Sequence, residues 1–85
     1  MMGNKQFENV AIKAVQKYYR DEHNKLVPID DLYVVWLVKV LQNNKCLISS
    51  VYKGDTSYFE MTYNGEKNEM YMDVYEKRMN KAIVL

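Results

Sequence analysis

The sequence predicts an α+β fold: one N-terminal helix packed on a four- or five-stranded antiparallel meander sheet. Two observations support this prediction. Up to about Glu22, apolar residues recur every three or four positions, which is typical of a helix with one buried side. From Leu32 onward they alternate or form short runs separated by turn-forming residues, which is typical of strands. Because the chain has 85 residues, a single domain spanning 1–85 is expected.

The first element is expected to be a helix from Asn4 to about Glu22. Asn4 is the expected N-cap, because its short side chain can accept hydrogen bonds from the free amides of the first turn. The expected buried stripe consists of Phe7, Val10, Ala11, Ala14, Val15 and Tyr18. Lys13, Lys17 and Arg20 share the opposite side of the helix. These cations are candidates for contacting phosphate groups of a nucleic acid, although a solvated charged face is the commoner role of such residues.

A hairpin is expected next, formed by a strand from Leu32 to Leu41 and a second strand from Cys46 to Tyr52. A two-residue turn at Asn43-Asn44 is expected, because asparagine tolerates the left-handed conformation that such turns require. One face of this hairpin would carry Val34, Trp36, Val38, Val40, Leu47 and Val51, and the other Tyr33, Val35, Leu37, Leu41, Cys46, Ile48 and Tyr52. Trp36 and Val38 are expected to lie in the core, so the Leu37 face would remain uncovered.

A second hairpin is expected around Asn64-Gly65, the strongest short turn signal in the chain. The segments 57–63 and 69–75 both alternate apolar and polar residues. A four-residue loop is favoured, because a two-residue loop would place Glu60 opposite Glu69. In either case Phe59 and Met61 share a face with Met70 and Met72. The tail 81–85 is apolar enough to form a last edge strand.

Tyrosine is unusually frequent, with eight residues in this short chain. One helix covers only one face of such a sheet, so apolar and tyrosine side chains on the other face are expected to bind a protein partner or a second copy, giving a homodimer. The predicted contact residues are Tyr33, Leu37, Leu41, Ile48, Tyr52, Tyr58, Tyr71 and Tyr75. Half-buried tyrosines at the rim of a sheet are the alternative interpretation. Base stacking is not favoured, because Glu60 and Asp73 would repel a nucleic acid.

Composition argues against several functional classes. The net charge is +1, so the electrostatic signature of a nucleic-acid or membrane-surface binder is missing. The N-terminus lacks the apolar run of a signal peptide, and the longest apolar run, 32–38, is far shorter than the roughly 20 residues of a membrane helix. A soluble, cytoplasmic protein without membrane contact is therefore expected.

The sequence also lacks the residue sets on which catalysis usually depends. Its three glycines form no phosphate-binding loop, and His23 has no second histidine with which to hold a metal. Cys46 lies in an apolar strand, where a thiol usually acts as a small apolar side chain. Glu60 and Asp73 could form a carboxylate pair on one sheet face, but two solvated strand residues are the commoner outcome. We expect no enzyme activity, no metal and no cofactor.

Two segments, VVWLVKVLQNNKCLIS and YFEMTYNGEKNEMYMDVYEK, resemble a family of small uncharacterised proteins encoded by phages and prophages of Gram-positive bacteria. The resemblance runs from the FENVAIKAV helix to the final strand. It implies a phage accessory protein in the host cytoplasm and brings no catalytic residues. With the surplus apolar face, it suggests stoichiometric binding to a host replication or defence protein. The alternative is binding of nucleic acid or a nucleotide signal through the helix cations or the tyrosine face.

Overall fold

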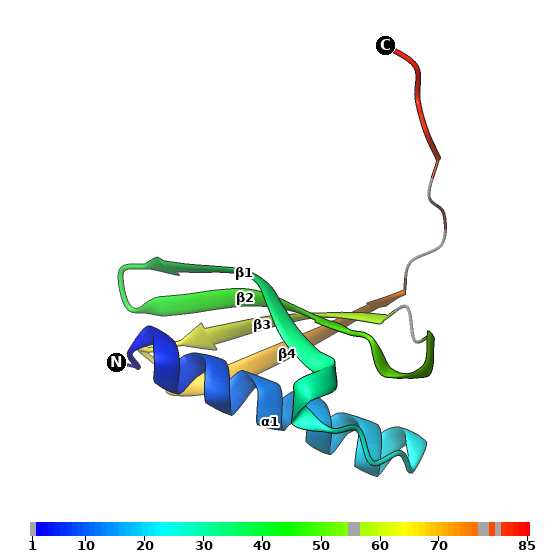
Figure 1. The fold of residues 1–85 in the computed structure, drawn as a ribbon. Helices are drawn as coiled ribbons and strands as arrows, with labels where there is room; N and C mark the ends of the chain where they lie inside the picture. Colours follow the sequence, from blue (N-terminus) through cyan, green and yellow to red (C-terminus); the bar gives the residue numbers. More distant parts are fainter. Residues whose placement is uncertain (1, 55–56, 77–78, 80) are drawn as a thin grey trace.

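The structure, a computed structural model, describes residues 2–54, 57–76, 79 and 81–85. Its elements are α1 (Asn4–His23), the 3₁₀ turn η1 (Ile29–Asp31), β1 (Leu32–Val40), β2 (Asn43–Ser50), the 3₁₀ turn η2 (Tyr52–Gly54), β3 (Ser57–Asn64) and β4 (Glu69–Glu76). The four strands form one antiparallel sheet in the order β1-β2-β3-β4, and α1 lies along one side of it (Figure 1). The predicted helix-on-meander fold is confirmed, with four strands.

The ends of α1 differ slightly from the sequence prediction. The N-cap is Gly3, which has no side chain with which to cap the helix, so the assignment of Asn4 as the cap was wrong. At the other end Asn24 adopts the left-handed conformation with φ 52°, and the amide of Lys25 donates to the carbonyl of Tyr19 at 3.1 Å. A left-handed residue that returns the chain toward the last turn is a common helix terminator.

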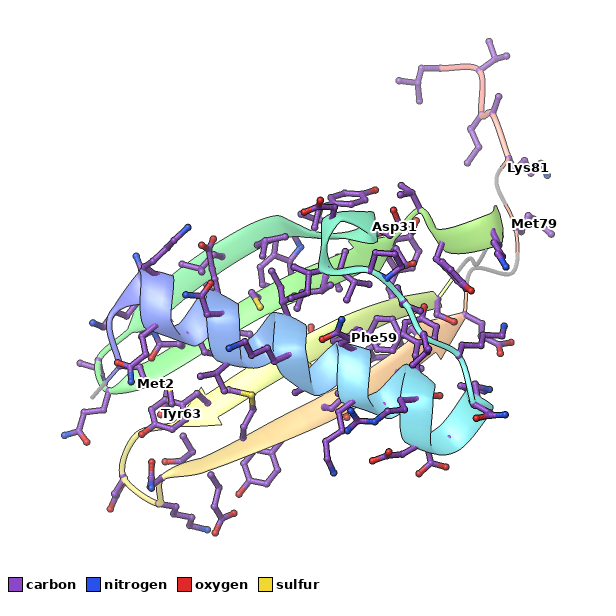
Figure 2. All side chains as sticks on the ribbon, turned by 60° about the horizontal axis from the view of Figure 1, so that its bottom comes forward. Met2, Asp31, Phe59, Tyr63, Met79 and Lys81 are labelled. Carbon is purple, nitrogen blue, oxygen red and sulfur yellow. The ribbon has the colours of Figure 1, made fainter. Side chains whose placement is uncertain are left out.

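The core lies between α1 and the two central strands. Figure 2 shows Phe59 and Tyr63 of β3 beneath the helix. The ring of Phe59 packs edge to face against Tyr18 and Tyr19, with centroid distances of 5.5 and 5.4 Å. The buried core residues are Phe7, Ala11, Val15, Tyr19, Val27, Leu32, Cys46, Ile48, Phe59, Met61 and Tyr63. The helix is therefore rotated relative to the predicted stripe: Tyr19 is fully buried, whereas Val10 is exposed.

The turn between β1 and β2 is formed by Leu41 and Gln42, because Val40 pairs with Asn43. Leu41 takes the left-handed conformation there, with φ 56°, so the predicted turn at Asn43-Asn44 was wrong. Trp36 pairs with Leu47 and Leu37 with Cys46. The observed register differs from the predicted one by an even number of residues. For this reason Trp36 still shares a face with Leu47, as expected.

The choice of the inner face was wrong. Trp36 and Val38, predicted to be core residues, are 41% and 44% exposed, whereas Ile48 is fully buried. The physical reason lies in β3, where Phe59 pairs with Ile48 and Met61 pairs with Cys46. Together these pairs form a wide apolar surface, and α1 packs there. We call this side of the sheet the covered face and the other side the open face.

A β-bulge in β1 further changes the predicted faces. The register shifts between Val34, which pairs with Ile48, and Trp36, which pairs with Leu47, so Val35 is an extra residue. Before the bulge the parity is reversed, and Tyr33 therefore lies on the open face with Trp36, while Val34 lies on the covered face. A strict alternation along β1 could not predict this change.

The second hairpin follows the prediction. Asn64 pairs with Glu69 across a four-residue loop, and Phe59 and Met61 share the covered face with Met72 and Met70. The loop begins with the side chain of Asn64, whose Oδ1 accepts hydrogen bonds from the amides of Glu66 and Lys67 at 3.1 and 3.2 Å. Such local hydrogen bonds are the usual reason that asparagine favours turns.

The tail 81–85 does not form the expected edge strand. It runs away from the sheet instead (Figure 1). Its side chains are exposed. Figure 2 shows Met79 and Lys81 beyond the end of the sheet.

Candidate functional site

The open face is the candidate functional site, because nothing in the described part of the chain packs over it. Its central residues fall into three rows across the four strands, which are the cross-strand partners of β1, β2, β3 and β4 in order. The rows are Tyr33–Ser49–Tyr58–Tyr75, Trp36–Leu47–Glu60–Asp73 and Val38–Lys45–Thr62–Tyr71. Partners within a row lie on one side of the sheet, with strands about 4.8 Å apart.

The half of the open face over β1 and β2 is mainly apolar. Tyr33, Trp36 and Val38 are each about half exposed, and Leu47 between them is partly buried. Single exposed apolar residues are common on any protein, but neighbouring ones form a continuous patch of the kind that marks an interaction site. A tryptophan at the centre of such a patch is typical of a binding hot spot.

The half over β3 and β4 combines carboxylates with tyrosines. Glu60 and Asp73 are direct cross-strand partners, with Tyr58 and Tyr75 in the row on one side and Tyr71 on the other. Glu60 is balanced by Lys45 of β2, whose Nζ lies 3.5 Å from a Glu60 carboxylate oxygen. Asp73 is exposed and makes no ion pair or side-chain hydrogen bond within the described residues. This half is thus suited to a cation or a hydrogen-bond donor of a partner.

Tyr71 is fixed at the edge of this half. Its hydroxyl donates to Oε2 of Glu69 at 2.5 Å. This hydrogen bond to a carboxylate raises the pKa of Tyr71 above its ordinary value, with burial contributing in the same direction. The phenol of Tyr71 therefore stays neutral to a higher pH than that of an ordinary tyrosine.

The predicted contact residues do not form one surface. Tyr33, Tyr58, Tyr71 and Tyr75 lie together on the open face. The others do not join them: Leu37 and Ile48 lie on the covered face against the core, Tyr52 packs against the core from η2, and Leu41 is 86% exposed in the β1–β2 turn. Leu37 and Ile48 were therefore assigned to the wrong side of the sheet.

Sequence reasoning missed Trp36, Val38 and Leu47 as residues of the open face. The signal that could have identified them was in β3, where a charged Glu60 stands between Phe59 and Met61. Glu60 pairs with Leu47, and Leu47 pairs with Trp36. Because cross-strand partners lie on the same side of a sheet, the charge of Glu60 indicates that the whole row faces solvent.

The cations on α1 are all exposed, but two of them are paired with one carboxylate. Nζ of Lys17 lies 3.1 Å from Oδ2 of Asp21, and Nε of Arg20 lies 3.4 Å from Oδ1. The hydrogen bond from Lys17, assisted by Arg20, lowers the pKa of Asp21 below its ordinary value. Lys13 has no such partner in the described part of the chain. The helix thus presents less free positive charge than its sequence suggests.

The remaining reactive side chains do not form a second site. Burial raises the pKa of Cys46 from 9.0 to about 11, so its thiol stays protonated and unreactive near neutral pH. His23 is exposed, and its Nε2 lies 3.0 Å from the hydroxyl of Tyr18. The described residues contain no group of three or more side chains suited to hold a metal ion, and none of their helices is long and apolar enough to cross a membrane.

Comparison with known protein families places the chain in one of them. A model of a family of unknown function, DUF6275, matches residues 8–85, and the chain therefore belongs to this family. Neither the curated proteins nor the solved structures contain a match. The expected membership of an uncharacterised family is confirmed, while the family description carries no statement of phage origin. The match begins within α1, at residue 8, and runs through the sheet to the tail 81–85.

Proposed function

We propose that this member of DUF6275 is an interaction protein that acts by stoichiometric binding of another protein through its open face. The observation that carries the proposal is a wide sheet face that the described residues leave uncovered, with Trp36 and Tyr33 on β1 and with Tyr58, Tyr71 and Tyr75 on β3 and β4. Tryptophan and tyrosine contribute most to binding when a partner excludes water from them, since they bury a large area at a small cost in rotamer entropy.

A protein fits this surface better than a nucleic acid does. The tyrosines that could stack on bases surround Glu60 and Asp73, which would repel phosphate groups. Lys45, the cation at the centre of the open face, is paired with Glu60. On α1, Lys17 and Arg20 are paired with Asp21. The arrangement of charge therefore favours a partner that brings apolar side chains and a cation.

The biological setting of this proposal comes from the sequence resemblance to proteins encoded by phages and prophages. In that setting the chain works in the host cytoplasm as an accessory protein, and its partner is a host replication or defence protein. Stoichiometric binding suits such a role, because it requires no catalytic group and blocks the partner by covering its surface.

Affinity capture from host lysate tests this proposal, with the open face as the variable. The unaltered chain is expected to retain one protein in equimolar amount. Trp36→Ala and Tyr75→Ala are each expected to raise the dissociation constant of the complex with that protein roughly thirtyfold, which corresponds to a loss of about 2 kcal/mol, as is typical of a hot-spot residue. Val10→Ala, on the exposed side of α1, is the matched control and should bind normally. Equal retention by all variants, or retention of nothing, would refute binding through the open face.

A further inference from the structure

The tail contains an apolar segment that the other described residues leave uncovered. We call Lys81, Ala82, Ile83, Val84 and Leu85 the arm. Ile83 is 75% exposed, Val84 is 96% exposed and Leu85 is fully exposed. Three consecutive large aliphatic side chains in water are unfavourable unless a partner covers them.

We propose that the arm of one copy lies across the open face of a second copy, and that two copies exchange arms to form a homodimer. This inference rests on the proposed function, since it names an occupant for the same face. A free protein would then keep its apolar face covered until a partner displaces the arm.

The spacing of the arm matches the middle row of the open face. An extended chain advances about 3.3 Å per residue, so Lys81 and Leu85 lie about 13 Å apart, with Ile83 midway on the same side. The row Asp73–Glu60–Leu47–Trp36 crosses four strands about 4.8 Å apart and is about 14 Å long. Lys81 above Asp73 therefore places Leu85 above Trp36.

Charge and polarity change along the arm and along the row in the same order. Lys81 is the cation of the arm, and Asp73 is the exposed carboxylate of the row that has no partner of its own among the described residues. Glu60 is already paired with Lys45. Leu85 would then lie above Trp36, and Ile83, about 7 Å from Lys81, would lie above the row between Glu60 and Leu47. The opposite orientation would place Lys81 above Trp36 and Leu85 above Asp73.

A second copy is the occupant that this geometry favours. Within one chain the arm runs clear of the sheet, so the same monomer leaves both the arm and the open face exposed (Figure 1). A single five-residue arm buries less than the roughly 1,200 Å² of a stable interface. Reciprocal exchange about a two-fold axis doubles the contact, because the open face of each copy then holds the arm of the other.

The first test measures the dimer dissociation constant by sedimentation equilibrium on the full chain. Ile83→Asp is expected to raise it at least tenfold, because residue 83 would face the row between Glu60 and Leu47, where a new carboxylate meets a like charge on one side and an apolar side chain on the other. Val84→Asp is the matched control: it lies next in sequence but faces away from the row, and it should change the constant less than twofold. Both residues are exposed in the monomer, so neither substitution threatens the fold.

The second test reverses charges. Lys81→Glu and Asp73→Lys are each expected to weaken the dimer severalfold. The double variant should recover most of the loss, because each arm would then bring Glu to a Lys. Failure of the double variant to recover would refute the pairing of Lys81 with Asp73.

Other results would separate this inference from the proposed function. A wild-type chain that stays monomeric at high concentration refutes the exchange of arms between two copies. If the arm of that monomer is protected from proteolysis, it binds the sheet of its own chain instead. A dimer that Ile83→Asp leaves intact and Trp36→Ala dissociates refutes the arm, while the open face remains a protein-binding surface. If the Trp36→Ala variant also retains as much partner from lysate as the unaltered chain does, the proposed function is refuted as well.

Discussion

The two faces of the sheet are built from the same four strands, yet they differ in what their side chains contact. On the covered face, Cys46, Ile48, Phe59 and Met61 are fully buried beneath α1. On the open face, residues of similar size such as Trp36 and Tyr75 are about half exposed. The difference lies in the residues between them: Glu60 and Asp73 stand at the centre of the open face, and no charged side chain stands in the corresponding row of the covered face.

This comparison shows which strand decides the orientation of a sheet. β1 is apolar on both sides and would satisfy either orientation. β3 alternates strictly, so its Phe59 and Met61 leave only one favourable side for the helix. The register of β3 with β2, and of β2 with β1, then determines which side of β1 faces the helix, and Trp36 lies on the open face. The strand with the clear pattern determines the orientation of the strand without one.

The largest expected effect is the contrast between Phe59 and Tyr75, one aromatic residue from each face. Phe59→Ala leaves a cavity beside Tyr18 and Tyr19 and should lower the free energy of unfolding by about 3–5 kcal/mol. Tyr75→Ala, on an edge strand and half exposed, should lower it by about 1 kcal/mol. Urea unfolding followed by circular dichroism measures both values, at a concentration low enough to keep copies apart.

Equal losses in the two variants would mean that the open face is buried within the folded monomer. The comparison between the faces would then fail, and with it the basis for a binding surface. Trp36→Glu and Leu37→Glu extend the contrast along β1. The structure predicts a folded Trp36→Glu variant and an unfolded Leu37→Glu variant, the reverse of what the sequence pattern alone indicates.

The sequence was sufficient for the fold because its local signals agree with one another. The three- and four-residue spacing around Phe7 and Val15 predicted α1, and Asn64-Gly65 predicted the β3–β4 hairpin with its four-residue loop. Both signals depend on short-range geometry, which a sequence displays directly. The N-cap was missed because Asn4 is a favourable cap residue in general, whereas this helix begins one residue earlier at Gly3.

The candidate site could be predicted only in part. Tyr58, Tyr71 and Tyr75 share one face, as the alternation of β3 and β4 predicts, whereas Tyr33 joins them only because the bulge at Val35 reverses the parity of β1. Their role in binding stays a prediction. Trp36, Val38 and Leu47 were missed, because the inner face of β1 depends on pairing with β2 and β3 and on the bulge at Val35. The turn at Leu41-Gln42 was missed for a related reason: leucine disfavours a left-handed φ, and the pairing of the strands imposes one there. Long-range pairing thus overrode local preference.

Cys46 offers a chemical probe of the covered face. In the folded chain at pH 8, its labelling by a thiol reagent should be at least about a hundredfold slower than in urea, because burial keeps the thiol protonated and inaccessible. The raised pKa also makes stability depend on pH. An unfolded thiol loses its proton near pH 9, whereas the folded one keeps it to about pH 11.

The contribution of Cys46 is therefore fully present below pH 9 and declines as the pH rises to about 11. Tyrosines titrate in the same range, so the informative quantity is the difference between the unmodified chain and Cys46→Ala. That difference should change between pH 9 and 11 and stay constant between pH 6 and 8. Rapid labelling at pH 8 without urea would show that α1 does not protect this face.

The smallest expected effect concerns the ion pair of the open face. Lys45 and Glu60 are partly exposed, with their charged atoms 3.5 Å apart, so water screens their attraction. A double-mutant cycle with Lys45→Met and Glu60→Gln should give a coupling energy of about 0.2–1 kcal/mol at low salt, and less in 1 M salt.

Measuring the same cycle in dilute and in concentrated protein tests whether a second copy covers this ion pair. A coupling energy that rises with concentration would show that a second copy removes this pair from water, whereas a value above about 2 kcal/mol in the dilute monomer would mean that the face is already closed.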